Sequence, residues 1–287
     1  MTGSERLLVR RTAKLFVGGA FPRSESGRSY EVTSHDGRPF AFATQASRKD
    51  LRDAVTAARA AQPAWAAATA INRGQVLYRV AELMEGRRAQ FEGELADAGA
   101  ADPVRGVDAA IDRWVWYAGW ADKIAQVRGS SNPVAGPYFD FSVPEPTGVV
   151  GVVAPQDQAL LGLVGRLAPA IVGGNAAVVI ASERAPLPAV SLGEVIATSD
   201  VPGGVVNILT GITAELAPWL AGHMDVNAID VTGVAPEQIA QVERAAADNV
   251  KRVVRAPAAD PFSEASQSPY EVTALMEIKT VWHPIGA

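Results

Sequence analysis

The residues that could do chemistry in this chain gather in loops that follow short apolar runs. The four loops cover residues 154–158, 181–184, 210–213 and 232–236. In a parallel α/β sheet, ligands bind beyond the carboxyl ends of the strands, where the free N–H groups of helix N-termini favour phosphate. No loop contains a GxGxxG sequence. The loops alone therefore indicate an α/β protein suited to a nucleotide, without fixing its function.

The composition narrows the chemistry further. The chain has no cysteine, which excludes disulfides, thiolate metal sites and a cysteine nucleophile. Only His35, His223 and His283 are present, far apart in sequence, so we predict no metal site. A net charge of −5 argues against a nucleic-acid partner. Without a signal peptide or a long apolar run, we expect a soluble, cytoplasmic protein that does not bind a membrane.

Helices dominate the predicted N-terminal third, after a strand with a glycine turn over residues 14–21. Ser47 and Asp50 form a capping-box pattern, which predicts a helix start at Ser47. Pro63 is expected to end this helix. Two more helices are predicted, one after residue 72 and one over residues 107–125.

From residue 147 onward, short apolar runs alternate with amphipathic helices. The runs are GVVGVVAP, AAVVI, VVNILTG, NAIDVTG and KRVV, and a helical stretch separates each from the next. This alternation is typical of βαβ units. We therefore predict a Rossmann-like, doubly wound, mostly parallel sheet of about five strands with flanking helices.

The C-terminal stretch has the pattern of a separate strand. Met276, Ile278, Thr280 and Trp282 fall on one face at a period of two, with Glu277, Lys279 and Val281 on the other, which predicts a half-buried strand. The preceding residues 255–269 contain several prolines and small polar residues, so they are interpreted as a linker.

Several stretches, taken together, resemble the aldehyde dehydrogenase superfamily. They are KLFVGGAFPRSESGRSYEV, EPTGVVGVVAP, RLAPAIVGGNAAVVIASERAPLPAV, VPGGVVNILTG, NAIDVTG and AAADNVKRV, in the order of the family's cofactor domain. The tail MEIKTVW resembles the family's last strand, which takes part in oligomerisation. The resemblance implies a short form in which the catalytic domain is missing.

The same resemblance implies a domain organisation with a small β oligomerisation module. Its parts are the N-terminal strand and helices of the cofactor-type domain (1–136), an oligomerisation hairpin (137–146), the Rossmann-like core (147–254), the linker (255–269) and the oligomerisation strand (270–287). The tail strand is expected to pair with the hairpin and to extend a partner subunit's sheet.

The resemblance also implies that the catalytic groups are lost. Family members use a cysteine thiolate, a glutamate base and an asparagine amide in the oxyanion hole, and this chain has no cysteine. No glutamate follows the Lys251–Arg252–Val253 strand at the expected place. Asp157 replaces the asparagine, where its charge would repel an oxyanion, and it is instead interpreted as a helix N-cap. We predict no catalytic residue.

Part of the cofactor site is retained by resemblance. The matching positions are Pro155, Ser182, Glu183, Thr232 and Gly233, and Glu183 is expected to accept from ribose hydroxyls. The family's lysine before this glutamate is absent, and the phosphate-facing turn is altered after Gly233. The resemblance thus implies that NAD or NADP can bind, while no cofactor is required.

Three functions follow as hypotheses. The first is a non-catalytic structural or regulatory subunit that assembles as a homodimer or as a hetero-oligomer with a full-length aldehyde dehydrogenase. The alternative is a cofactor-binding subunit of a composite NAD(P)-dependent oxidoreductase acting on aldehydes. A third is a sensor whose cleft holds a different nucleotide or an acyl molecule.

Overall fold

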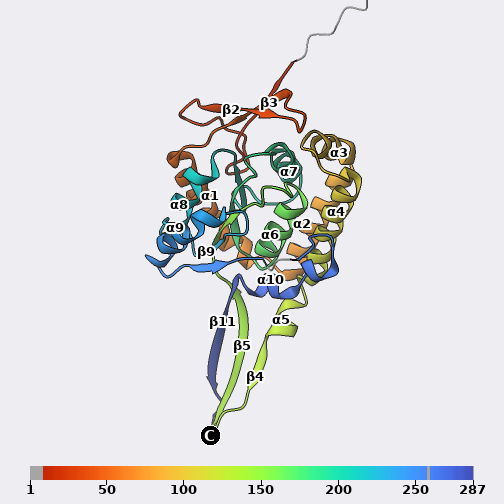
Figure 1. Ribbon diagram of the computed structural model, residues 1–287. Helices are drawn as coiled ribbons and strands as arrows, with labels where there is room; N and C mark the ends of the chain where they lie inside the picture. Colours follow the sequence, from red (N-terminus) through yellow and green to blue (C-terminus); the bar gives the residue numbers. More distant parts are fainter. Residues whose placement is uncertain (1–8, 257–258, 287) are drawn as a thin grey trace, which may run out of the picture.

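A five-stranded parallel sheet forms the centre of the protein, as the sequence predicts (Figure 1). The computed structural model describes residues 9–256 and 259–286. The strand order is β10-β9-β6-β7-β8. The strands are β6 (Val149–Val153), β7 (Ala176–Ile180), β8 (Val206–Leu209), β9 (Ala228–Asp230) and β10 (Arg252–Val254), alternating with α6 (Leu161–Val172), α7 (Leu187–Thr198), α8 (Thr213–Ala221) and α9 (Pro236–Ala247).

Both faces of this sheet are covered, which explains its continuous apolar strands. Val150 and Val152 of β6 belong to the core cluster that contains residues of α2, α4 and α6. Val149 and Val153, which alternate with them, belong to the cluster that contains residues of α1, α8 and α9. Successive side chains of a strand point to opposite faces, so every residue of β6 is buried.

The N-terminal third combines a small sheet with five helices. Strands β1 (Arg11–Ala13), β2 (Ser29–Thr33) and β3 (Pro39–Thr44) pair in the order β1-β3-β2. The helices are α1 (Arg48–Ala67), α2 (Ala70–Glu85), α3 (Arg88–Asp97), α4 (Pro103–Trp120) and α5 (Ile124–Arg128). The predicted third helix is therefore two helices, and α3 was not predicted. None of the helices in the described part of the chain is long and apolar enough to cross a membrane.

Two local predictions in this third are wrong. Residues 14–21 form no regular strand: Phe16 makes an isolated bridge to Ile208 of β8, and the chain reverses at Gly18 and Gly19, which both have positive φ. Pro63 does not end α1, which continues to Ala67. Beyond the proline, Trp65 is buried and its indole Nε1 donates to the Ile171 carbonyl at 2.8 Å, so packing outweighs the lost backbone hydrogen bond.

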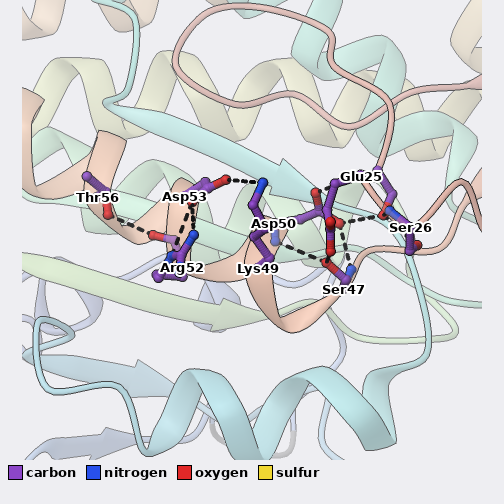
Figure 2. A network of polar contacts seen from close by, with 9 residues as sticks. Glu25, Ser26, Ser47, Lys49, Asp50, Arg52, Asp53 and Thr56 are labelled. Carbon is purple, nitrogen blue, oxygen red and sulfur yellow. Dashed lines mark hydrogen bonds and ion pairs between the residues drawn. The ribbon is translucent and has the colours of Figure 1, made fainter.

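The capping box at the start of α1 is confirmed, and tertiary contacts enlarge it (Figure 2). The Ser47 hydroxyl accepts from the Asp50 N–H at 3.2 Å, and Asp50 Oδ2 accepts from the Ser47 N–H at 2.7 Å. Ser24 also donates its hydroxyl to Asp50 at 2.6 Å. Burial by itself would raise the pKa of Asp50, but the hydrogen bonds from Ser24 and Ser47 outweigh it and lower the pKa. The helix start thus anchors the loop before β2.

A three-stranded ribbon projects from the body of the molecule (Figure 1). It contains β4 (Ser130–Asn132), β5 (Tyr138–Pro146) and β11 (Met276–Pro284), in the order β11-β5-β4. The tail strand pairs antiparallel with β5 from Met276 opposite Pro146 to Pro284 opposite Tyr138. Residues 137–146 are therefore one strand of this ribbon instead of a complete hairpin. The domain boundaries and the oligomerisation role stay predictions.

The tail strand is not half-buried as its alternation predicts. Ile278 is 53% exposed and Trp282 is 58% exposed, and only Met276, at the body end of β11, is buried. The physical reason is that no layer of the described chain packs over the outer part of the ribbon.

The segment between β10 and β11 is structured where it is described. It contains a short 3-10 helix (Glu264–Ser266) and helix α10 (Pro269–Thr273). Val272 of α10 and Leu275 after it belong to the main core cluster. The predicted linker therefore ends in a segment that packs against the body.

A buried ion cluster holds this segment in place. Arg166 of α6 donates through Nε to Asp230 Oδ2 of β9 at 2.7 Å and through a second nitrogen to Glu271 of α10. Asp230 is fully buried and Arg166 nearly so. Burial by itself would lower the pKa of Arg166, but the charges of Asp230 and Glu271 outweigh it and raise the pKa. The ion pair between Arg166 and Glu271 thus holds α10 against α6, because the buried guanidinium requires carboxylate partners.

Removal of this buried charge should destabilise the protein strongly. Arg166→Met leaves Asp230 buried without its partner, which should cost about 3–5 kcal/mol of unfolding free energy. The matched control is Arg184→Met, since Arg184 pairs with Asp157 at 2.6 Å but both side chains are more than 70% exposed. That change should cost at most about 1 kcal/mol. Urea unfolding of both variants measures the difference, and equal small losses would contradict the assigned role of Arg166.

Candidate functional site

The candidate site lies where the loops after β6, β7 and β8 meet, at the carboxyl ends of the parallel strands. Gln156 joins these loops. Its Oε1 accepts from the Glu183 N–H at 2.9 Å and from the Ser182 hydroxyl at 3.3 Å. Its Nε2 lies 3.4 Å from the Thr213 hydroxyl at the start of α8. Gln156 is not among the predicted site residues, yet its side chain bonds to both neighbouring loops.

Ser182 and Glu183 both bond inside the protein. Ser182 is almost fully buried; its hydroxyl donates to the Gln156 carbonyl at 3.0 Å and accepts from the Ala185 N–H at 3.2 Å. Glu183 Oε2 accepts from the Thr213 N–H at 3.0 Å. The carboxylate therefore satisfies the N-terminus of α8. Burial and the charge of Glu183 raise the pKa of Tyr30, which places this tyrosine of β2 beside the same loop.

Thr232 and Gly233 lie after β9, on the other side of β6 from Ser182 and Glu183. The Thr232 N–H donates to Asp230 Oδ1 at 2.9 Å, and its hydroxyl accepts from the Ala256 N–H at 2.8 Å. The Gly233 N–H donates to the Val153 carbonyl at 3.0 Å. Gly233 thus links the loop after β9 to the end of β6, and Thr232 links it to Ala256, just after β10.

Gly233 is required by close packing. A Cβ at this position would lie 2.0 Å from the Ala154 carbonyl oxygen, far inside any tolerated contact. The glycine therefore has a structural role at the turn, whatever else binds there.

Asp157 does not take its expected position at a helix start, and Pro155 packs against that helix. Pro155 lies next to Gly162, where an added Cβ would be 3.0 Å from its ring. The N-cap of α6 is Leu160, so the interpretation of Asp157 as the cap is wrong. Asp157 is exposed and forms an ion pair with Arg184 instead. The loop makes a further turn before α6 begins, and this turn moves Asp157 away from the free N–H groups.

These residues fit a dinucleotide poorly. The N–H groups of Thr232 and Gly233 already donate to protein oxygens, and helix α9 begins with Pro236, which has no N–H to offer a phosphate. Glu237 adds a negative charge in the first turn of α9. Glu183, the ribose-binding candidate, already accepts from Thr213. The described residues also contain no cluster of potential metal ligands.

Comparison with known protein families identifies the family of this chain. The sequence profile of the aldehyde dehydrogenase family matches residues 21–257. The chain belongs to the aldehyde dehydrogenase family. The Rossmann-like fold, predicted from the alternation of apolar runs and helices, is confirmed.

Curated relatives that this chain matches are about twice as long. Human retinal dehydrogenase 2 is 33% identical over 248 residues, which cover 84% of this chain and 47% of that protein. Cytosolic aldehyde dehydrogenase 1 of Elephantulus edwardii is 32% identical over 248 residues, covering 84% and 49%. This member of the family thus spans about half the length of the curated relatives it matches.

Solved structures agree with the fold. HpcC from Thermus thermophilus superposes with a TM-score of 0.81 at 28% identity, over 86% of this chain and 48% of that one. A betaine aldehyde dehydrogenase from Staphylococcus aureus, solved in complex with NAD+, superposes with a TM-score of 0.80 at 24% identity, over 85% and 49%. The second likeness shows the fold alone.

Replacement of Gly233 tests the packing of the loop between β9 and α9. Gly233→Ala should destabilise the protein by about 1–3 kcal/mol, because the added methyl group clashes with backbone that cannot rotate away. Gly93→Ala is the matched control: Gly93 lies inside α3 with open space around its Cβ position, and the change should stabilise by up to about 1 kcal/mol. Thermal unfolding reports both, and a neutral Gly233→Ala variant would contradict the close contact.

Proposed function

We propose that this chain is a non-catalytic member of the aldehyde dehydrogenase family that assembles with a second family chain through the ribbon β4-β5-β11. The observation that carries the proposal is the exposed apolar surface of the ribbon. Tyr138, Ile278 and Trp282 on one face, Phe139 on the other face, and Ile285 after the strand end are each more than 40% exposed. Exposed apolar side chains gathered in this way favour an interaction surface.

The backbone of the ribbon supports the same role. Within residues 9–256 and 259–286, β11 pairs with β5 alone, so beyond Met276, whose carbonyl accepts from Arg252, its other edge presents unpaired N–H and C=O groups. Such an edge is a template for another strand. The polar side chains inside the ribbon keep it rigid: Asn132 donates to Asp140 at 2.8 Å and to Ser142 at 2.9 Å, and Ser142 bonds Thr280 at 2.8 Å. A preorganised edge costs less entropy to dock.

The absence of catalytic groups supports a non-catalytic role. The sequence has no cysteine, so no thiolate can attack an aldehyde from this chain. Asp157, the residue after Gln156, is exposed and forms an ion pair with Arg184. A carboxylate has no hydrogen to donate to an oxyanion. A partner in the assembly is therefore either a second copy or a full-length aldehyde dehydrogenase that carries its own catalytic groups.

Charged substitutions on the ribbon should abolish assembly. We expect the double variant Ile278→Glu/Trp282→Glu to separate from its partner in native mass spectrometry of the protein purified from its own host, because two charges would be buried at the interface. Met224→Glu is the control, since Met224 is 70% exposed in the turn before β9 and lies outside the ribbon. This variant should keep the complex.

The composition of the native complex decides the partner. A mass equal to two copies supports a homodimer, and a heavier complex that contains a full-length aldehyde dehydrogenase supports a hetero-oligomer. A monomeric wild-type protein, or a complex that survives the double variant, would overturn the proposal.

We also infer that assembly requires no dinucleotide. The polar groups of Glu183, Thr232 and Gly233 already bond within the protein. Isothermal titration of the purified chain with NAD and with NADP should therefore give no saturable heat at cofactor concentrations up to about 1 mM. Saturable binding below that concentration would favour the composite NAD(P)-dependent oxidoreductase instead.

A further inference from the structure

The open edge of β11 presents a definite set of backbone groups. In an antiparallel pair, alternate residues bond to the neighbouring strand, and the residues between them point their N–H and C=O groups the other way. Thr147 donates to the Leu275 carbonyl at 3.3 Å, and Ile285 donates to the Pro137 carbonyl at 2.8 Å, at the two ends of the pairing with β5. The odd-numbered residues of β11 therefore bond to β5, and the even-numbered residues face the open edge.

The prolines of the ribbon agree with this assignment. Pro144 lies opposite Ile278, Pro146 lies opposite Met276, and Pro284 lies opposite Tyr138. Each of these pairs contains an even-numbered residue of β11, so it needs no hydrogen bond between the two strands. Proline has no N–H, and it is tolerated where the ladder requires none.

Both ends of the open edge are closed to another strand. At the body end, Arg252 donates to the carbonyls of Ala274 and Met276. At the far end, Pro284 has no N–H to donate. In the part of the chain that the structure describes, the residues that present both an N–H and a C=O group to the open edge are Ile278, Thr280 and Trp282.

This short edge can pair with itself. When two β11 strands run antiparallel about a two-fold axis through Thr280, Thr280 lies opposite Thr280 of the second copy, and Ile278 lies opposite Trp282 of the second copy. All of these residues point their backbone groups toward the open edge, so each pair is of the hydrogen-bonded type. The two-fold pair therefore satisfies every free N–H and C=O group of the edge.

The neighbouring registers are less favourable. An axis through Lys279 would place two lysines directly opposite each other, and like charges in that position destabilise a sheet. An axis through Val281 would place Ile278 opposite Pro284, which has no N–H to donate. The axis through Thr280 has neither defect.

The side chains also match in this register. Trp282 packs edge-on against Tyr138 with ring centroids 5.7 Å apart, and both lie on the same face as Ile278. In the two-fold pair, Trp282 of each copy lies between its own Tyr138 and Ile278 of the second copy, which covers the apolar side chains that are exposed in the single chain. On the other face, Glu277 lies opposite His283 of the second copy, so no two like charges meet.

We infer that β11 pairs antiparallel with β11 of a second copy of this chain, with Thr280 on the two-fold axis. The two three-stranded ribbons then form one continuous sheet, and the open edges disappear. This inference rests on the proposed function, since it uses the same ribbon. It goes further by naming a second copy as the partner and by fixing the register.

Cysteine cross-linking tests the register, because the chain has no cysteine of its own. In the inferred pair the Cα atoms of the two Thr280 residues lie about 5.5 Å apart, within the range that a disulfide spans. The full-length Thr280→Cys variant, produced alone and oxidised mildly, should therefore change from monomer to disulfide-linked dimer in non-reducing electrophoresis.

A matched pair of variants tests the register without changing Thr280, whose hydroxyl bonds Ser142 at 2.8 Å. Lys279 lies opposite Val281 of the second copy, with Cα atoms about 4.5 Å apart. Lys279→Cys and Val281→Cys should each stay unlinked when oxidised alone, and they should form a linked dimer when the two variants are co-expressed. Circular dichroism and thermal unfolding check that each variant folds.

The inference fails if the wild-type chain assembles in native mass spectrometry but neither Thr280→Cys nor the co-expressed pair gives a linked dimer. A linked dimer of Lys279→Cys alone would also overturn it, because the axis would then pass through Lys279. In both cases the proposed function stands.

The oligomeric state of the wild-type chain separates the two proposals. If the chain is monomeric when produced alone but bound to a full-length aldehyde dehydrogenase when purified from its own host, the inference is wrong and the proposed function stands. A chain that is monomeric from both sources overturns both.

Discussion

The buried charge of Arg166 is the constraint on which the C-terminal third depends. A guanidinium removed from water must be neutralised, and its two partners come from different parts of the chain: Asp230 from the centre of the sheet and Glu271 from α10. Because Glu271 must reach Arg166, α10 is drawn onto α6, and Leu275 then enters the main core. Arg252 extends the attachment by donating to the Ala274 carbonyl at 3.1 Å and to Glu277 at 2.8 Å. The ribbon therefore leaves the body from a fixed point.

The loops at the carboxyl ends of the strands are closed on themselves. In this type of sheet the same loops usually present free N–H groups and side chains to a ligand. Here Gln156 bonds the loops after β7 and β8, Glu183 satisfies the start of α8, and Gly233 packs against Ala154 too closely for any side chain. A backbone N–H that already donates within the protein must lose that hydrogen bond before it can donate to a ligand.

Two surfaces remain available, and they differ in shape. The ribbon offers apolar side chains and an unpaired strand edge over an extended length, as a protein interface requires. A cavity beside α4 is bounded by Phe262 and by Arg105, whose guanidinium lies 4.3 Å above the Phe262 ring. The segment after β10 serves both, because it carries Phe262 to the cavity and leads through α10 into β11. One segment, between β10 and β11, thus both borders the cavity through Phe262 and packs against the core through Val272 and Leu275.

The sequence by itself determined what depends on neighbours along the chain: the alternation of apolar runs and helices that makes the parallel sheet, and the capping box of Ser47 and Asp50. Hydrophobic periodicity and helix capping depend on residues close together in the sequence, so they can be predicted from the sequence alone. Only the tertiary structure decided that α1 continues past Pro63, that Asp157 lies outside the start of α6, and that the alternating tail strand is exposed. It also decided that Arg166 is a buried charge between two distant carboxylates. Burial and pairing depend on which segments meet in space, and a linear pattern carries no information about a partner that lies 64 or 105 residues away.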